Sequence, residues 1–414
     1  MEAQLAAKPE PCALDTPASS HGFGEQVCTP LIEVSVVIPC LNEADTIAVC
    51  IEKAQRALKE HDIRGEVVVA DNGSTDGSIE IAKGLGARVV NVPTPGYGSA
   101  LMGGIEAALG RYIIMGDADD SYDFSELPKF VEKLRMGYDL VQGCRLASGG
   151  GVVKPGAMPF SHRWFGNPFF SLLVRHWFRA PIHDVYCGMR GFSKTLYESL
   201  GQRCTGMEFA TEMIIKSSLQ ECRIAEVPIT LWPDGRKAHP PHLKTFRDGW
   251  RTLRFFLMSS PRWLFLMPGS ILGWLGVIGY IVALPGMTIR GVTFDAHTLL
   301  FASMFIMCGY QAVLFGVLAR TFAITEGLLP EDRQLTRLFK FITLEKGLIA
   351  AGASMLVGAV LLIWAIQTWV AARFGPLDYA VTMRLVVPGA TLVALGFQTG
   401  LASFFISLLG LRRK

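Results

Sequence analysis

Four long apolar segments in the C-terminal part constrain the fold of this chain more than any other feature. They cover residues 263–285, 298–322, 347–370 and 385–410. Each is close to the roughly 20 apolar residues that a helix needs to cross the hydrocarbon core of a bilayer. We therefore expect a transmembrane domain of about four helices over residues 263–414.

Basic residues predict the orientation of these helices, because short cytoplasmic loops are enriched in Lys and Arg. The loop after the second segment and the C-terminus carry most of them: Arg333, Arg337, Lys340, Lys346, Arg412, Arg413 and Lys414. We therefore expect a multi-pass inner-membrane protein whose N-terminal domain, 323–346 loop and C-terminus are cytoplasmic. The segments carry no acidic or basic relay, so we interpret them as an anchor, through which the protein could also form a homo-oligomer.

The chain before these segments has two parts. Residues 1–30 are rich in Ala, Pro, Ser and Gly, which predicts a disordered tail. Short β-branched runs then alternate with stretches of helical spacing. The expected strands cover residues 34–38, 66–70, 87–92 and 111–116. This alternation predicts an α/β domain over residues 31–240, with a mostly parallel sheet and helices on both faces.

Acidic side chains follow several of the expected strands. They are Glu43, Asp71, Asp76, Asp117 and Asp119. In an open α/β sheet, ligands bind outside the carboxyl ends of the strands, and clustered carboxylates are costly to bury unpaired. Mg²⁺ and Mn²⁺ prefer such oxygen ligands. The pattern favours a nucleotide site with a divalent cation over the alternative, a solvated acidic turn.

Other function classes fit the sequence less well. The dinucleotide-binding fingerprint Gly-x-Gly-x-x-Gly is missing after the first expected strand. A net charge of only +3 argues against nucleic acid as the main partner. The nine cysteines include no Cys-x-x-Cys pair and no Cys/His cluster, which argues against a zinc site.

Three segments together resemble the family 2 glycosyltransferases of the GT-A fold. They are Pro39-Cys40-Leu41-Asn42-Glu43, Asp71-Asn72-Gly73-Ser74-Thr75-Asp76 and Asp117-Ala118-Asp119. Later segments are similar to the polyprenyl-phosphate branch, the dolichol- and undecaprenyl-phosphate sugar synthases, and the resemblance covers about residues 34–260. It implies an inverting, metal-dependent enzyme that moves a hexose from a UDP- or GDP-linked sugar to a polyprenyl phosphate.

The resemblance implies roles for the donor-side residues. Pro39, Leu41 and Glu43 would border the nucleotide base, with Glu43 near the ribose or base. Asp71 would accept a hydrogen bond from the base, and Asp76 belongs to the same nucleotide-binding motif. The loop before Ser99 reads Thr94-Pro95-Gly96-Tyr97, where the family often carries a basic residue, so phosphate contacts from this loop are not expected.

The acidic motif supplies the expected metal ligands. Asp117 would lie near the ribose and the sugar, and Asp119 would reach a Mg²⁺ or Mn²⁺ ion that bridges the diphosphate. Asp120 could help to hold the metal or the acceptor. Asp123 has the character of a helix N-cap.

Basic residues are expected on the acceptor side, because a lipid phosphate is already an anion and needs no general base. Arg145 would face the diphosphate. Asp184 and Arg190 lie in a segment that resembles the family's acceptor-side loop, and the alternative for them is a structural ion pair. Arg236 and Lys237 are the preferred candidates for holding the acceptor anion, the alternative being a stretch that only touches anionic headgroups.

Two amphipathic stretches predict attachment to the membrane surface. Leu243, Phe246, Trp250, Leu253 and Leu257 recur at helical spacing, with basic residues on the other faces, so we expect an in-plane helix over residues 241–262. Residues 160–179 show a similar mixture of aromatic residues and arginines.

Two alternative functions remain open. The enzyme could act on another lipid or on a polysaccharide, although the Gln-x-x-Arg-Trp motif of polymer synthases is missing. The chain could also be a non-catalytic membrane module that binds a nucleotide sugar.

Overall fold

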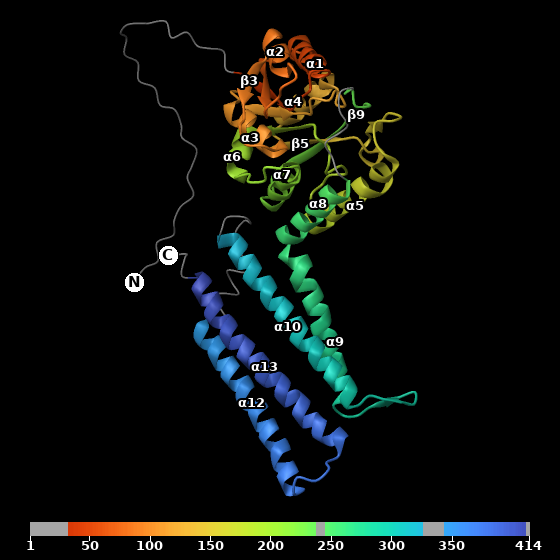
Figure 1. Ribbon diagram of the computed structural model, residues 1–414, viewed down its shortest axis with the longest axis vertical. Helices are drawn as coiled ribbons and strands as arrows, with labels where there is room; N and C mark the ends of the chain where they lie inside the picture. Colours follow the sequence, from red (N-terminus) through yellow and green to blue (C-terminus); the bar gives the residue numbers. More distant parts are fainter. Residues whose placement is uncertain (1–31, 237–244, 326–342, 411–414) are drawn as a thin grey trace, which may run out of the picture. The chain divides into compact units, whose positions relative to one another are not determined.

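A computed structural model of the protein describes residues 32–236, 245–325 and 343–410 (Figure 1). The expected tail over residues 1–30, Lys237 and the basic residues Arg333, Arg337 and Lys340 lie outside the described residues. The described chain begins with an α/β domain and ends with long apolar helices, in the order that the sequence predicts.

The α/β domain is built on one seven-stranded sheet with the order β3-β2-β1-β4-β7-β5-β8. The strands are β1 (Val34–Cys40), β2 (Gly65–Asp71), β3 (Arg88–Asn91), β4 (Tyr112–Met115), β5 (Leu140–Cys144), β7 (Arg190–Ser193) and β8 (Ile224–Pro228). β7 runs antiparallel to β4 and β5, and the other neighbours in the sheet are parallel. The expected mostly parallel sheet is confirmed, and the insertion of β7 was not predicted.

Helices cover both faces of this sheet, because successive side chains of a strand point to opposite faces. Along β1, Val36 and Ile38 pack in one buried cluster, and Val37 packs in the other. The helices are α1 (Ile47–Glu60), α2 (Ser78–Gly84), α3 (Tyr97–Ala107), α4 (Leu127–Arg135), α5 (Asn167–Phe178), α6 (Lys194–Leu200) and α7 (Glu208–Leu219). α1, α2 and α4 contribute to the first cluster, and α3, α5, α6 and α7 contribute to the second.

Short elements complete the α/β domain. The 3₁₀ turns are η1 (Phe124–Glu126) and η2 (Ala147–Gly149), the π-helical turn η3 (His162–Gly166) precedes α5, and β6 (Val152–Val153) pairs with β9 (Thr230–Leu231). Asp123 caps η1 by accepting a hydrogen bond from Ser125 N, as its sequence context predicts.

The two amphipathic stretches pack on one another rather than lying separately on the surface. The second of them forms α8 (Thr245–Ser259). Phe256 of α8 is fully buried, and its ring lies 5.8 Å from that of Phe170 in α5. Phe160, Trp164 and Phe165, ahead of α5, are 60–70% exposed. The aromatic surface expected near α5 is therefore present, whereas α8 is in part a core helix.

Four described helices are long and apolar enough to cross a membrane, which confirms the expected number. The π-helical turn η4 (Arg262–Leu266) leads into α9 (Met267–Ala283), and α10 (Ala296–Thr325), α12 (Leu344–Ala371) and α13 (Tyr379–Gly410) follow. A hairpin of β10 (Thr288–Ile289) and β11 (Val292–Thr293) joins α9 to α10.

Small residues and hydroxyl groups hold these helices together. A Cβ added at Gly309 of α10 would lie 2.6 Å from the backbone nitrogen of Gly273 in α9, so the two backbones are in close contact. Tyr310 and Thr399 form a 2.6 Å hydrogen bond between α10 and α13. Such packing is expected in lipid, where apolar burial gives little driving force for helix association.

We predict that Gly309→Leu separates α9 from α10 and lowers the free energy of unfolding by about 1–3 kcal/mol, the usual cost of overpacking. Gly352→Leu on α12 is the matched control, because nothing lies within 4 Å of its Cβ position. Thermal unfolding of both full-length variants in detergent measures the difference. Equal losses of stability in the two variants would contradict the close contact at Gly309.

Candidate functional site

The candidate site lies where β1, β2 and β4 end at the same edge of the sheet. Parallel pairing aligns Cys40 of β1 with Asp71 of β2, and Val37 of β1 with Met115 of β4, so the loops that follow these strands become neighbours. Hydrogen bonds connect the first two loops: Ala44 N donates to Asp76 Oδ2 at 2.9 Å. Asp76 therefore fixes the loop that carries Glu43, a role that its motif alone did not reveal.

The side chains after β2 are largely occupied in shaping their own loop. Asp71 is buried, and its carboxylate accepts hydrogen bonds from the backbone nitrogens of Gly73 and Ser74 at 3.0 and 3.1 Å. The amide of Asn72 donates to Thr94 O at 2.8 Å and accepts from Gly96 N at 2.8 Å. Asn72 thus ties the loop after β3 to the site. Pro39 is buried within β1, and Leu41, the first residue after this strand, is exposed.

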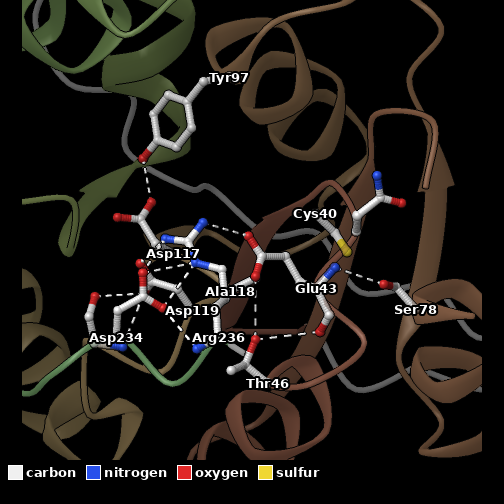
Figure 2. Close-up of polar contacts among 12 residues, drawn as sticks. Cys40, Glu43, Thr46, Ser78, Tyr97, Asp117, Ala118, Asp119, Asp234 and Arg236 are labelled. Carbon is white, nitrogen blue, oxygen red and sulfur yellow. Dashed lines mark hydrogen bonds and ion pairs between the residues drawn. The ribbon is translucent and has the colours of Figure 1, made fainter. Parts of the chain in front are cut away.

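Asp117 lies in the loop after β4, two residues beyond the end of the strand, and is bound by a tyrosine (Figure 2). The Tyr97 hydroxyl donates to Asp117 Oδ1 at 2.8 Å. Burial and the nearby charge of Asp119 raise the pKa of Asp117 to about 6, while the Tyr97 hydrogen bond opposes this rise. Tyr97 begins α3 and belongs to the segment from which no phosphate contacts were expected. Its contact with Asp117 was not predicted.

Asp119 joins two segments that are far apart in the sequence. Its Oδ1 accepts hydrogen bonds from the nitrogen and the hydroxyl of Ser121 at 3.0 and 2.6 Å. Its Oδ2 accepts from Arg236 Nη2 at 2.8 Å, and its backbone oxygen accepts from Gly235 N at 2.9 Å. The neighbouring Asp120 has a positive φ of 57° and forms a 2.8 Å ion pair with Lys53 of α1.

Arg236 lies among three carboxylates of the site (Figure 2). Its guanidinium is 3.1 Å from Glu43 Oε1, 2.8 Å from Asp119 Oδ2 and 2.9 Å from Asp234 Oδ2, and its side chain is 11% exposed. The structure thus brings Arg236 to Glu43 and Asp119, a proximity that was not predicted. Asp234 was missed, although it is only two residues from Arg236 in the sequence.

Arg145 forms a buried ion pair, which the sequence-based expectation of a contact with the diphosphate did not include. Its Nε and Nη2 donate to the two carboxylate oxygens of Asp184 at 2.7 and 2.8 Å, and Asp184 is fully buried. Asp184 is thus in a structural ion pair, but its partner is Arg145 and not Arg190, with which the alternative grouped it. The bidentate geometry occupies both carboxylate oxygens and stabilises the end of β5 against the 183–188 loop.

Arg190 is also fully buried, at the start of β7. Its guanidinium donates to Cys187 O at 2.8 Å and to the backbone oxygen of Ala210 in α7. Its Nε has no hydrogen-bond partner among the described residues, and burial lowers its pKa. These contacts give Arg190 a structural role between the 187–190 segment and α7.

The carboxylates of this site fit a divalent cation that takes its remaining ligands from water and a substrate. Among the described residues, no three His, Cys, Asp or Glu side chains are grouped as ligands of an ion. Mg²⁺ usually takes only one or two carboxylates and completes its shell with water and substrate phosphates. A Cβ at Gly188 would lie 2.5 Å from Asp117 Oδ2, so the glycine leaves space beside this oxygen. Asp117 and Asp119 are therefore the residues that could hold the ion.

The raised pKa of Asp117 predicts a pH-dependent stability. Between the ordinary aspartate pKa of about 3.9 and the folded value, the folded chain binds more protons than the unfolded chain, so the free energy of unfolding falls as the pH rises. Asp117→Asn removes this titration and should raise stability above pH 6 by about 1–2 kcal/mol, with convergence on the wild type near pH 4. Chemical unfolding in detergent with EDTA measures both proteins across this range. A gap that does not widen with pH would contradict the prediction.

The buried ion pair predicts a large effect at Asp184. Asp184→Asn leaves the Arg145 charge buried without its partner and should cost about 3–5 kcal/mol of unfolding free energy. Asp123→Asn makes the same chemical change at the exposed cap of η1, where Asn caps equally well, and should have little effect. Chemical unfolding of the full chain measures both. A stable but inactive Asp184→Asn variant would instead favour a direct role in the reaction.

Two parts of this chain match known protein families, and curated relatives align with it. Residues 35–201 match the family model described as glycosyl transferase family 2, and residues 317–410 match the glycosyltransferase family 2 C-terminal transmembrane region. The low-salt glycan biosynthesis hexosyltransferase Agl6 of Haloferax volcanii is 38% identical over 91% of this chain and 89% of its own length. The dolichyl-phosphate hexose transferase of the same organism is 33% identical over 52% of this chain and 89% of its own length.

A solved structure also aligns with part of this chain. The glucosyl-3-phosphoglycerate synthase of Mycobacterium tuberculosis, in complex with Mn²⁺, uridine diphosphate and glucosyl-3-phosphoglycerate, aligns with a TM-score of 0.44 and 24% identity. The alignment covers 55% of this chain and 79% of that one.

Proposed function

Because this chain belongs to the family 2 glycosyltransferases, we propose that it transfers a hexose from a UDP- or GDP-linked sugar to a polyprenyl phosphate. At the coarser level the protein is a hexosyltransferase of glycan biosynthesis, with a GT-A-like α/β domain and a multi-pass membrane domain. The observation that carries the proposal is that Glu43 and Asp119, from the loops after two neighbouring parallel strands, bind a single guanidinium, with Asp117 only two residues before Asp119.

A divalent metal is part of this proposal. Asp117 and Asp119 would hold Mg²⁺ or Mn²⁺ between them and the donor diphosphate. The ion would neutralise the charge that develops on the leaving diphosphate. Tyr97 would keep Asp117 Oδ1 occupied, so that Oδ2, beside Gly188, is the oxygen available to a ligand.

The reaction itself would be a single displacement at the anomeric carbon. An oxygen of the lipid phosphate forms the new bond to this carbon, while the bond to the nucleoside diphosphate breaks and the configuration inverts. Since the attacking phosphate is already anionic, no carboxylate needs to remove a proton. The chain must instead offset the repulsion between two anions, and Arg236, together with Lys237 outside the described residues, would supply positive charge.

The proposed acceptor and location follow from the membrane domain and a relative. A dolichyl-phosphate hexose transferase aligns with about half of this chain, which supports a polyprenyl phosphate as acceptor. Phe160, Trp164 and Phe165 form an exposed aromatic surface that would enter the headgroup region of a bilayer. We place the reaction at the cytoplasmic face of the inner membrane, where nucleotide sugars are available.

The test is transfer of labelled sugar from a panel of UDP- and GDP-sugars to undecaprenyl phosphate, with full-length protein in detergent. We expect label in the lipid phase from one donor, dependent on Mg²⁺ or Mn²⁺. Asp119→Ala should lower the rate by about 10²–10³-fold, the effect typical of losing one electrostatic contact in the transition state. Asp123→Asn, in the same acidic stretch, should retain the wild-type rate because its contact is confined to η1.

The outcomes separate the alternatives. NMR of the product determines whether the anomeric configuration inverts. Donor binding and hydrolysis without a lipid product would indicate another lipid or a polysaccharide as acceptor. Binding of a nucleotide sugar without turnover of any kind would indicate a non-catalytic module and would reject the proposed enzyme.

A further inference from the structure

Arg236 occupies the position in which a cation is needed in this site. Its guanidinium contacts Glu43, Asp119 and Asp234, and four hydrogen bonds place it within 3.1 Å of their oxygens (Figure 2). An arginine side chain remains charged at all physiological pH values. The contacts therefore describe a permanent positive charge inside an acidic cluster that combines residues from both ends of the α/β domain.

The charges in this cluster do not balance. Glu43, Asp119 and Asp234 share the single charge of Arg236, and Asp117 lies close enough to Asp119 for their charges to interact. Two nearby cations have their own partners: Lys53 pairs with Asp120 at 2.8 Å, and Arg145 pairs with Asp184 at 2.7 Å. Arg190 donates to the backbone oxygens of Cys187 and Ala210, and its charge also interacts with that of Asp117. One guanidinium thus leaves an excess of negative charge, which a divalent ion would offset more completely.

Asp119 Oδ2 is the oxygen that both Arg236 and a divalent ion would bind. Asp119 Oδ1 is already occupied by the nitrogen and the hydroxyl of Ser121, so Oδ2 is the oxygen with which Asp119 can bind a cation. This oxygen accepts the hydrogen bond from Arg236 Nη2 at 2.8 Å. Two cations drawn to one carboxylate oxygen also repel each other, so the binding of one weakens the binding of the other.

We propose that Arg236 is the resident counter-ion of the metal-free site and competes with the divalent cation for Asp119 Oδ2. This inference rests on the proposed metal dependence and adds an order of events. When the metal and the donor enter, Asp119 exchanges its guanidinium partner for the ion, and Arg236 becomes available to an anion. Donor loading would thereby release the positive charge that a phosphate acceptor needs, and an unloaded site would not present it.

A competing explanation predicts the opposite change in metal affinity when Arg236 is removed. If Arg236 orients Asp119 for the metal, removal of the arginine weakens metal binding. If Arg236 competes with the metal, its removal strengthens metal binding. Metal affinity in the absence of substrate therefore distinguishes the two explanations without reference to turnover.

The experiment is a Mn²⁺ titration of full-length protein in detergent, with free Mn²⁺ followed by electron paramagnetic resonance. Arg236→Gln should bind Mn²⁺ about five- to tenfold more tightly than the wild type, as expected for loss of one competing, partly buried ion pair. Lys53→Gln is the matched control, since it removes an equal charge beside Asp120 and leaves the Asp119 contact intact. It should change the affinity by less than Arg236→Gln does.

Thermal unfolding provides the second readout. In EDTA, Arg236→Gln should unfold at a lower temperature than the wild type, because three carboxylates lose their counter-ion. Mn²⁺ should restore much of this loss and should stabilise the variant more than it stabilises the wild type. Asp119→Asn should abolish the Mn²⁺ response in both backgrounds.

Equal or weaker Mn²⁺ binding by Arg236→Gln, or an equal gain from Lys53→Gln, would overturn the inference. Failure of the proposed function gives a different result. In that case no donor yields a lipid product, yet the Mn²⁺ titrations still show competition at Asp119.

Discussion

Electrostatic repulsion among carboxylates at one edge of the sheet is the constraint on which the site depends. Parallel pairing of β1, β2 and β4 brings their carboxyl ends together, and an acidic residue follows each of them within a few positions. Burial, and then the nearby charge of Asp119, raise the pKa of Asp117 to about 6, and other groups offset the remaining charges one by one. Asp71 binds backbone amides, Asp120 binds Lys53, and Asp119 binds Arg236.

A second, buried layer supports this edge. Arg145 and Asp184 form a bidentate ion pair, and Glu226 of β8 accepts hydrogen bonds from the backbone nitrogens of His183 and Asp184. The Tyr122 hydroxyl accepts hydrogen bonds from Arg145 and from Gly188 N, and Gly188 lies beside Asp117. The charged residues of this layer contribute to the site by fixing the loop next to Asp117, which explains why they are buried.

The membrane domain follows a different physical rule. Its helices are apolar on faces that contact lipid, so contacts between helices depend on small residues and on hydroxyl groups rather than on apolar burial. Gly309 against Gly273 and Tyr310 against Thr399 are examples. The described spans contain no ion pair in their central parts, and the 3.2 Å pair of Arg384 with Asp295 lies near helix ends.

Periodicity and motif order in the sequence were sufficient to predict the alternating strands, the four apolar helices and the acidic residues at the strand ends, because each of these is a local property. The pairing of charges was not predictable, since it joins residues far apart in the chain. Arg145 was expected to face the diphosphate, and its pairing with Asp184 was not foreseen. The hydrogen bond from Tyr97 to Asp117 was not predicted either. Arg236 was predicted to be a functional cation from its neighbours in the sequence. Only the tertiary structure shows that it lies against Glu43 and Asp119, because folding alone decides which distant carboxylates share one guanidinium.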